Sequence, residues 1–256
     1  MSYVDLHCHL LPGIDDGAPT PGDALAHARR LQAEGVRDIA CTPHVKRAEF
    51  PAVEIGALPA LRAALQRRID EAGLLLRLHG GGELCHVDAL DLADDELAAI
   101  AQGPAKARWI LLECPFAGVD PAFLAAVARL SELGYGVLLA HPERSAGFLR
   151  RGLDAVAPWL GDGALLQVNV CSLLGNHGLV VQDAAHALLR RGLVHVLASD
   201  GHPGTREHTV QLGFHLLLRA GATSAQAVRL TQDNPRALLE QGMPSLVGPG
   251  LERLAA

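Results

Sequence analysis

The chain has 256 residues, a formal net charge of −6 and a hydrophobic fraction of 49%. This length and apolar content suffice for one complete hydrophobic core of the size of an α/β barrel. The acidic balance, with no basic stripe, argues against nucleic acid as a partner, and no apolar run reaches the roughly 18 residues that a membrane span needs.

The cysteines and the N-terminus predict the cellular compartment. The cysteine count of five is odd and no Cys-x-x-Cys pair occurs, which favours reduced thiols over a disulfide framework. The N-terminus lacks a basic region followed by an apolar one, so no signal peptide is predicted. We therefore expect a cytoplasmic protein. Thirteen histidines beside two tyrosines and two tryptophans require a functional explanation.

The first predicted element is a short apolar strand that begins at Tyr3 and runs into His7 and His9. Alternate side chains of an extended chain share a face, so the two histidines point the same way. A loop rich in proline and glycine follows and carries Asp15 and Asp16. Imidazole and carboxylate groups at a strand end suit a divalent metal such as Zn, Mn or Fe. For this segment alone, the alternative is one buried histidine followed by turn-forming aspartates.

Six further strands are predicted from short apolar runs that end at glycine, proline or polar residues. They cover residues 36–42, 74–78, 109–112, 136–140, 164–170 and 193–198. Helices are predicted between and after them, over residues 23–34, 54–72, 91–101, 121–133, 153–159, 183–191, 205–220, 224–231 and 235–240. The tail after Gly242 is expected to lie along the surface.

The alternation of seven strands with helices predicts an α/β fold of parallel βα units. No linker, composition break or repeat divides the sequence, so residues 1–256 are predicted to form a single domain. Seven units in one sheet favour a (β/α)7 barrel, and a doubly wound open sheet is the alternative.

Side chains that can bind metal fall at the C-terminal ends of six of the seven predicted strands. In a barrel that end is where the active site forms, so residues far apart in sequence would converge there. A single histidine at a strand end is often only a satisfied polar group, but chance does not readily explain the recurrence. The residues are His7, His9, His44, Glu83, Glu113, His141, Asp200 and His202, together with Asp16 of the first loop.

Nine ligands are too many for one tetrahedral zinc, so two or three ions are predicted. Clustered cations stabilise both the attacking and the leaving oxygens of a displacement at phosphorus. Arg144 and Arg206 are near these ligands in sequence, and their fork geometry suits phosphate oxygens. A surface salt bridge is the alternative role for each arginine.

With these residues the sequence resembles the PHP (polymerase and histidinol phosphatase) superfamily. It resembles more closely the bacterial manganese-dependent protein-tyrosine phosphatases of capsule and exopolysaccharide loci, the CpsB/YwqE type. The tract that ends in Asp15-Asp16-Gly17 and the tetrad His141-Pro142-Glu143-Arg144 single out this branch. The matching segments are residues 5–17, 41–44, 82–84, 110–116, 140–144, 167–169, 172–175 and 198–202.

The resemblance implies a distorted seven-stranded barrel with a trinuclear Mn²⁺ site, with Fe and Zn as the alternative metals. It places His7, His9, Glu83 and Asp200 on the first metal. The second metal would be bound by Glu113 and His141, with Glu83 bridging it to the first. The third would be bound by Asp16, His44 and His202. It also implies catalytic roles for Arg144, Arg206 and Glu113, with Arg144 assisting the leaving group.

The resemblance further implies a substrate, which is phosphotyrosine on a bacterial tyrosine kinase that controls polysaccharide polymerisation and export. We expect hydrolysis by cation-activated water, with inert cysteines. The segment 46–53 lacks the aromatic and glycine pattern of the family, and we expect it to shape substrate access. The main alternative is a PHP-family small-molecule phosphatase of the histidinol-phosphate or nucleotide type. The oligomeric state stays open.

Two other classes fit the sequence less well. An amidohydrolase of this kind is expected to carry a carboxylated lysine, but Lys46 and Lys106 are the only lysines and neither ends a predicted strand cleanly. A non-catalytic binding protein is disfavoured by the complete ligand set.

Overall fold

The computed structural model describes residues 1–151 and 163–243. The helix predicted over residues 153–159 and the tail from residue 244 lie outside the described residues. Within the described part, no helix is both long enough and apolar enough to cross a bilayer.

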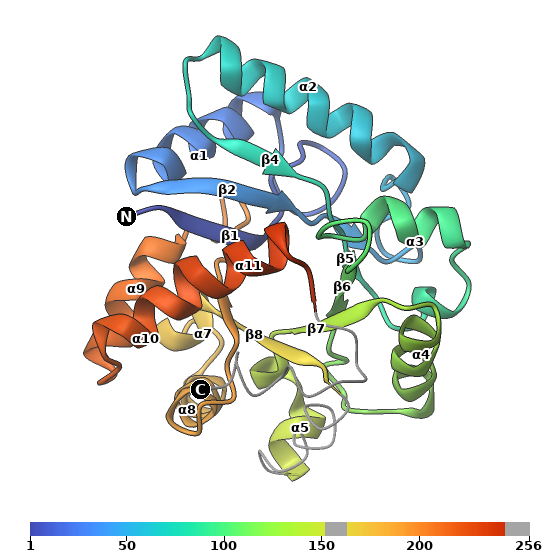
Figure 1. Cartoon of the computed structure of the whole chain (residues 1–256), viewed down its shortest axis with the longest axis vertical. Coiled ribbons are helices and arrows are strands. Elements are labelled where there is room, and N and C mark those ends of the chain that lie inside the picture. Colours follow the sequence, from blue (N-terminus) through green and yellow to red (C-terminus); the bar gives the residue numbers. More distant parts are fainter. Residues whose placement is uncertain (152–162, 244–256) are drawn as a thin grey trace.

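The strands pair in two parallel sheets (Figure 1). They are β1 (Tyr3–Cys8), β2 (Val36–Cys41), β3 (His44–Val45), β4 (Arg77–His79), β5 (Glu83–Leu84), β6 (Trp109–Glu113), β7 (Gly136–Ala140), β8 (Leu165–Asn169) and β9 (Val196–Ala198). The order is β1-β2-β4 in one sheet and β3-β5-β6-β7-β8-β9 in the other. The predicted α/β class with parallel strands is therefore confirmed.

Beyond two of the predicted strands, which correspond to β2 and β4, the structure adds the short unpredicted strands β3 and β5, so that each region is split between the two sheets. The first split is at Pro43, which has no N–H to donate to a ladder. The second is at glycines, where a Cβ on Gly82 would lie 2.9 Å from Cγ2 of Val45, so the backbone passes close to a side chain there. Where pairing resumes, His44 is the register partner of Glu83.

These interruptions are why a closed seven-stranded barrel is not confirmed. Among the described residues β1 and β9 are neighbours but pair in no ladder, and a single isolated bridge joins Cys8 of β1 to Gly201, three residues after β9. The backbone N–H of Asp200 also donates to the carbonyl oxygen of His7 at 2.9 Å. The strand pairs nevertheless form two sheets and no continuous ring.

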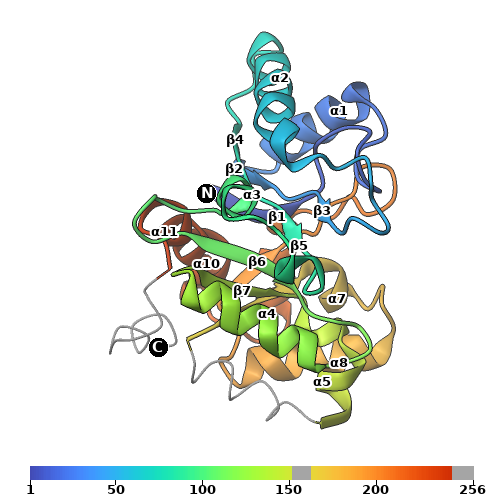
Figure 2. The same ribbon diagram turned by 90° about the vertical axis from the view of Figure 1, so that its right-hand side faces the viewer.

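The helices cover the outer faces of the sheets, and Figure 2 shows α1 and α2 on the three-stranded side and α4 beside β6 and β7. They are α1 (Pro21–Ala33), α2 (Leu58–Glu71), α3 (Asp94–Ile100), α4 (Pro121–Glu132), α5 (Ala146–Arg151), α7 (Val170–Leu174), α8 (Leu179–Arg190), α9 (Val210–Arg219), α10 (Ser224–Val228) and α11 (Asn234–Glu240).

Helix boundaries follow their caps. Thr20 accepts a hydrogen bond from the backbone N–H of Asp23, and proline occupies the first turn of α1. The helix predicted from residue 205 begins only at Val210, because Thr209 is its N-cap. Residues 205–209 remain in the loop that carries Arg206.

A small apolar cluster fills the space between the two sheets. It consists of buried strand residues from both sheets, among them Leu6 of β1, Leu111 of β6 and Val196 of β9. Leu238 and Met243 from the C-terminal part also belong to this cluster. Trp109 donates its indole N–H to the carbonyl oxygen of Leu238 at 3.0 Å. The core therefore packs beneath the strand ends and holds them in place.

His195 is a buried core histidine, and its burial makes the stability pH-dependent. It is 6% exposed, its Nδ1 accepts the N–H of Leu166 at 3.1 Å, and burial lowers its pKa from 6.5 to about 4. Between these values the unfolded chain binds a proton that the folded chain does not. The free energy of unfolding should therefore fall as the pH drops through this window, by about 3 kcal/mol from this group.

The substitution His195→Gln tests this, because an amide oxygen can still accept the Leu166 N–H but does not titrate. Urea denaturation from pH 7 to pH 4.5 should give a shallower loss of unfolding free energy for the variant than for the wild type. Parallel pH profiles would show that His195 does not titrate differently in the two states.

Candidate metal centre

All nine predicted ligands converge in one place. Among the described residues, some groups of at least three His, Cys, Asp or Glu side chains have ligand atoms that lie within 4.8 Å of one another. Within that part of the chain, such groups contain these nine residues and no others. Except for the exposed Asp16 and the half-buried His44, the nine are buried. The groups are His9, Asp16, His44 and His202; His7, Glu83 and His141; His7, His9 and Asp200; and His44, Glu83 and Glu113.

The strands explain why these residues meet. Parallel strands put their carboxyl ends at one side of the fold, and each ligand follows a strand end or lies in a short strand near it. His44 and Glu83 are adjacent because β3 and β5 pair in register. The groups differ from the implied assignment at several points: Glu113 groups with His44 and not with His141, and His9 groups with the implied third-metal ligands as well as with His7. The division of the ligands among three ions stays a prediction.

Glu83 is at the middle of the cluster. Its Oε2 atom is buried without a hydrogen bond and lies 3.3 Å from Nε2 of His7 and 3.4 Å from Nε2 of His9. The same oxygen lies 3.0 Å from Nδ1 of His44, and Oε1 lies 2.7 Å from Nε2 of His141. Burial raises the pKa of this carboxyl, but the surrounding histidines outweigh burial and hold it well below its usual value.

Three histidines are oriented from outside the cluster through Nδ1. His7 donates to Oε1 of Gln167 at 3.0 Å, His9 to Oδ2 of Asp15 at 2.8 Å, and His202 to the carbonyl oxygen of Asp200 at 2.9 Å. Each ring then presents Nε2 to the interior, which is the arrangement of metal-binding histidines. The Nε2 atoms of His7 and His9 are only 3.2 Å apart. Two ring nitrogens facing each other beside an unpaired buried carboxylate oxygen fit a cation between them.

The electrostatics of the cluster favour positive charge. Burial opposes protonation of His9, but the carboxylates of Asp15 and Glu83 outweigh it and raise its pKa to about 10. A proton and a metal ion compete for such a nitrogen. For Glu113, burial and the neighbouring charge of Glu83 raise the pKa to about 7. Ionising Glu113 beside the charged Glu83 is therefore costly unless a bound cation compensates the second negative charge.

The backbone is strained at two of the ligands. Of the non-glycine residues in the described chain, only His141 and Asp200 have positive φ, at 36° and 50°. A left-handed conformation costs about 1–3 kcal/mol and persists mainly where function requires it. His141 directly follows β7, and Asp200 lies two residues after the end of β9.

The two predicted phosphate-binding arginines lie at the edge of the cluster. Nη1 of Arg144 is 3.1 Å from Oδ2 of Asp200, and Nη2 of Arg206 is 3.2 Å from Oδ1 of the same carboxylate. Their side chains are 18% and 25% exposed. Asp200 thus pairs with two guanidinium groups beside the predicted ligands, where they can contact a phosphate group. Neither arginine forms only an isolated surface salt bridge.

Comparison with known proteins agrees with this geometry. The model of the family described as "Capsular polysaccharide synthesis, CpsB/CapC" matches residues 3–240. The chain belongs to the CpsB/CapC family.

Named relatives of this CpsB/CapC chain are tyrosine phosphatases. It is 29% identical over 217 residues to the tyrosine-protein phosphatase YwqE of Bacillus subtilis, covering 84% of this chain and 83% of the relative. It is 24% identical over 244 residues to the tyrosine-protein phosphatase CpsB of Streptococcus pneumoniae, covering 92% and 98%.

Solved structures give the same neighbours. A structure from work on YwqE and CpsB, described there as unique metal-dependent tyrosine phosphatases, matches with a TM-score of 0.78 at 25% identity and covers 95% of this chain and 96% of that chain. A phosphotriesterase homology protein of Escherichia coli with phosphate in its active site shares the fold alone, with a TM-score of 0.55 at 17% identity and coverage of 91% and 97%.

Several residues of the CpsB/CapC site escaped prediction. Asp15 accepts hydrogen bonds from His9 and from the backbone N–H of His44 at 3.0 Å. Gln167 bridges His7 to Asn169, and Asn169 donates to Asp200 at 2.7 Å. The sequence offered one signal for the last two, because residues 167–169 match the family pattern although they bind no metal in the predicted scheme.

One spacing in the sequence imitates the phosphate loop of cysteine-based phosphatases. Cys41 and Arg47 have the Cys-x5-Arg spacing, which the sequence alone gives no reason to discard. The structure excludes this role, because Cys41 is buried in β2 and burial raises its pKa to about 12. Arg47 instead pairs with Glu96 at 2.6 Å. This buried environment, and not the sequence spacing, argues against cysteine as the nucleophile.

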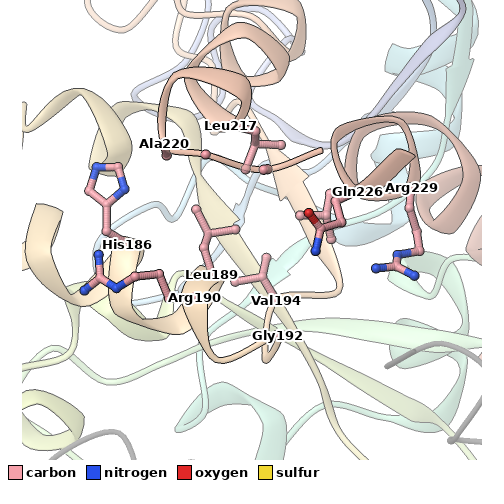
Figure 3. A pocket seen from close by; sticks show the side chains of 12 residues that line it. His186, Leu189, Arg190, Gly192, Val194, Leu217, Ala220, Gln226 and Arg229 are labelled. Atoms are coloured by element: carbon pink, nitrogen blue, oxygen red, sulfur yellow. The ribbon is translucent and has the colours of Figure 1, made fainter. Parts of the chain in front are cut away.

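A cavity of about 260 Å³ lies apart from the metal centre, among α8, α9 and α10 (Figure 3). Leu189, Val194 and Leu217 line it, with Arg190 and Arg229 also contributing. Val194 precedes β9, whereas the ligands Asp200 and His202 follow β9. The cavity is therefore at the opposite end of the strands and does not contain the predicted chemistry.

Proposed function

We propose that this chain is a metal-dependent protein-tyrosine phosphatase that acts on a bacterial tyrosine kinase of capsule or exopolysaccharide synthesis. The main support for this proposal is that nine side chains able to bind metal lie together beside two arginines. Family membership and the names of the relatives support the substrate class. The kinase partner follows from the family.

The donor set fits Mn²⁺, with Fe and Zn as alternatives. The nine residues offer imidazole nitrogens and carboxylate oxygens and no thiolate, a mixture that suits borderline divalent cations. Bound divalent cations would supply Lewis-acid stabilisation at phosphorus and lower the pKa of water. Asp15 and Gln167 would fix the orientation of the ligand histidines.

The protein's own groups have distinct roles in this proposal. Arg144 and Arg206 would bind the non-bridging phosphate oxygens and orient the ester. Arg144 would also stabilise the negative charge that develops on the phenolate oxygen as the bond to phosphorus breaks. Glu113 would act at the same centre as a ligand, its carboxylate being stabilised by the cation.

Two further proposals concern the setting of the site. We place the two sheets as parts of a distorted seven-stranded barrel, which the Cys8–Gly201 bridge and the apolar cluster between the sheets support. We also place the protein in the cytoplasm, since all five cysteines are free and buried, as reduced thiols would be.

A comparison of substrates tests the proposed function. Protein loaded with Mn²⁺ should hydrolyse a phosphotyrosyl peptide with a kcat/KM at least about tenfold higher than histidinol phosphate or a nucleoside monophosphate, because a site built for one ester discriminates by transition-state binding. Preference for histidinol phosphate or the nucleotide would instead assign a small-molecule phosphatase.

A further inference from the structure

Two phenylalanines stand at opposite ends of the row of ligand histidines. Phe50 stacks on His44 with ring centroids 4.7 Å apart and planes 6° from parallel. Phe116 stacks on His141 at 6.0 Å and 10°. Phe50 follows β3 and Phe116 follows β6, so separate loops supply the two rings. The segment 46–53, expected to lack the aromatic pattern of the family, thus still places one aromatic ring against a ligand.

The histidines between them form a continuous row. Ring centroids of His44 and His9 are 4.5 Å apart, those of His9 and His7 are 5.3 Å apart, and those of His7 and His141 are 5.6 Å apart. The metal-binding rings thus end in a phenyl ring on each side. A phosphate ester bound at either end of the row would therefore lie near a phenyl ring.

Phe116 has the stronger connection to substrate. It is 44% exposed, and the guanidinium carbon of Arg144 lies 4.9 Å from its ring centre. The residue that holds the phosphate in the proposed function is therefore directly against an exposed aromatic face. Exposed apolar area on such a side chain is stabilised when a ligand covers it.

We propose that Phe116, assisted by Phe50, forms an aryl-binding subsite that selects aromatic phosphate esters over aliphatic ones. This inference rests on the proposed function and names the residues that determine its specificity. With the phosphate on Arg144, the ester oxygen leads directly to the substrate ring, which can pack on Phe116 in an offset or edge-to-face arrangement. A phosphoserine side chain has no ring and would gain no binding free energy from packing on Phe116.

The test compares Phe116→Leu with Phe116→Tyr, both loaded with Mn²⁺. Leucine keeps apolar volume but removes the aromatic face, whereas tyrosine keeps the face. The ratio of kcat/KM for a phosphotyrosyl over a phosphoseryl peptide should fall about fivefold in Phe116→Leu and change less than about twofold in Phe116→Tyr. Adding Phe50→Leu should lower the ratio further. Leu133→Ala, an exposed apolar residue (41%) just after α4, is the matched control.

A binding measurement separates the subsite from catalysis. Calorimetry should show that wild-type protein binds benzylphosphonate more tightly than methylphosphonate, and that Phe116→Leu loses about fivefold of this preference while metal content is retained. An unchanged preference in both experiments would overturn the subsite, and Phe116 would then only pack against Arg144.

The two proposals fail in different ways. If the wild type hydrolyses none of these esters, the proposed function fails, while the phosphonate preference still decides whether the aryl-binding subsite exists. If the wild type is an active tyrosine phosphatase and Phe116→Leu keeps its aryl preference, only the subsite is wrong.

Discussion

Replacing Glu83 by glutamine is expected to lower kcat on a phosphotyrosyl peptide by at least about 10³-fold, equivalent to about 4 kcal/mol of transition-state stabilisation. The two oxygens of Glu83 lie within 3.4 Å of ring nitrogens of four predicted ligand histidines. Glutamine has the same shape but no charge, and its amide nitrogen cannot bind a cation. The variant should therefore lose bound metal as well as activity.

Metal analysis and single-turnover kinetics on the same preparation check this expectation. Glu132→Gln, an exposed carboxylate at the end of α4, removes the same charge outside the site and should keep both metal and activity. Circular dichroism should show that Glu83→Gln is folded. A folded Glu83→Gln variant with wild-type metal content and turnover would mean that Glu83 is not central to the site.

Arg144→Ala is expected to reduce kcat/KM on the same peptide by about 10²–10³-fold while leaving metal content intact. A forked donor aimed at charge that develops in the transition state is worth this much. Arg144 qualifies by position, since it pairs with the buried Asp200 at 3.1 Å and lies over Phe116. Arg144→Lys should fall between the two, because a point charge lacks the planar fork.

Steady-state kinetics with parallel metal analysis distinguish this role from a structural one. Arg190→Ala, in the cavity at the opposite end of the strands, removes an equal charge away from the site and should have no effect on kcat/KM. If Arg144→Ala lost metal in proportion to activity, the arginine would be a support for Asp200 and not a phosphate-binding group.

The sequence identifies side chains that the structure brings together, for a physical reason. Apart from Asp16 in the first loop, the predicted ligands lie near the ends of parallel strands. All such ends face one side, so a list of strand-end residues is also a list of neighbours. His7, Glu113 and Asp200 could be chosen in this way without knowledge of their distances. The α/β class follows from the same alternation of strands and helices.

What the sequence could not supply is set by local backbone conformation and by long-range contacts. The positive φ of His141 and Asp200 has no sequence signature, since both are ordinary L-residues. Whether β3 and β5 pair in a sheet apart from β2 and β4 depends on packing around Gly82 and not on strand propensity. Asp15 and the predicted ligand Asp16 are adjacent in sequence. Only the structure shows that Asp15 accepts a hydrogen bond from His9 and so orients a ligand.

The distinction between two phosphatase mechanisms also required structure. Cys41 and Arg47 match the spacing of a cysteine phosphate loop, and burial of the thiol in β2 with a pKa of about 12 removes that mechanism. A nucleophilic cysteine needs a lowered pKa and access to substrate.

The measurement that bears most directly on the metal centre is activity followed as metal is removed and returned. Dialysis against a chelator should abolish hydrolysis of a phosphotyrosyl peptide, and Mn²⁺ should restore it as up to three ions bind per chain. Iodoacetamide, which alkylates accessible thiols, should leave the native protein active. Full turnover by protein shown to be metal-free, or inactivation by the alkylator alone, would contradict a phosphatase built on these nine ligands.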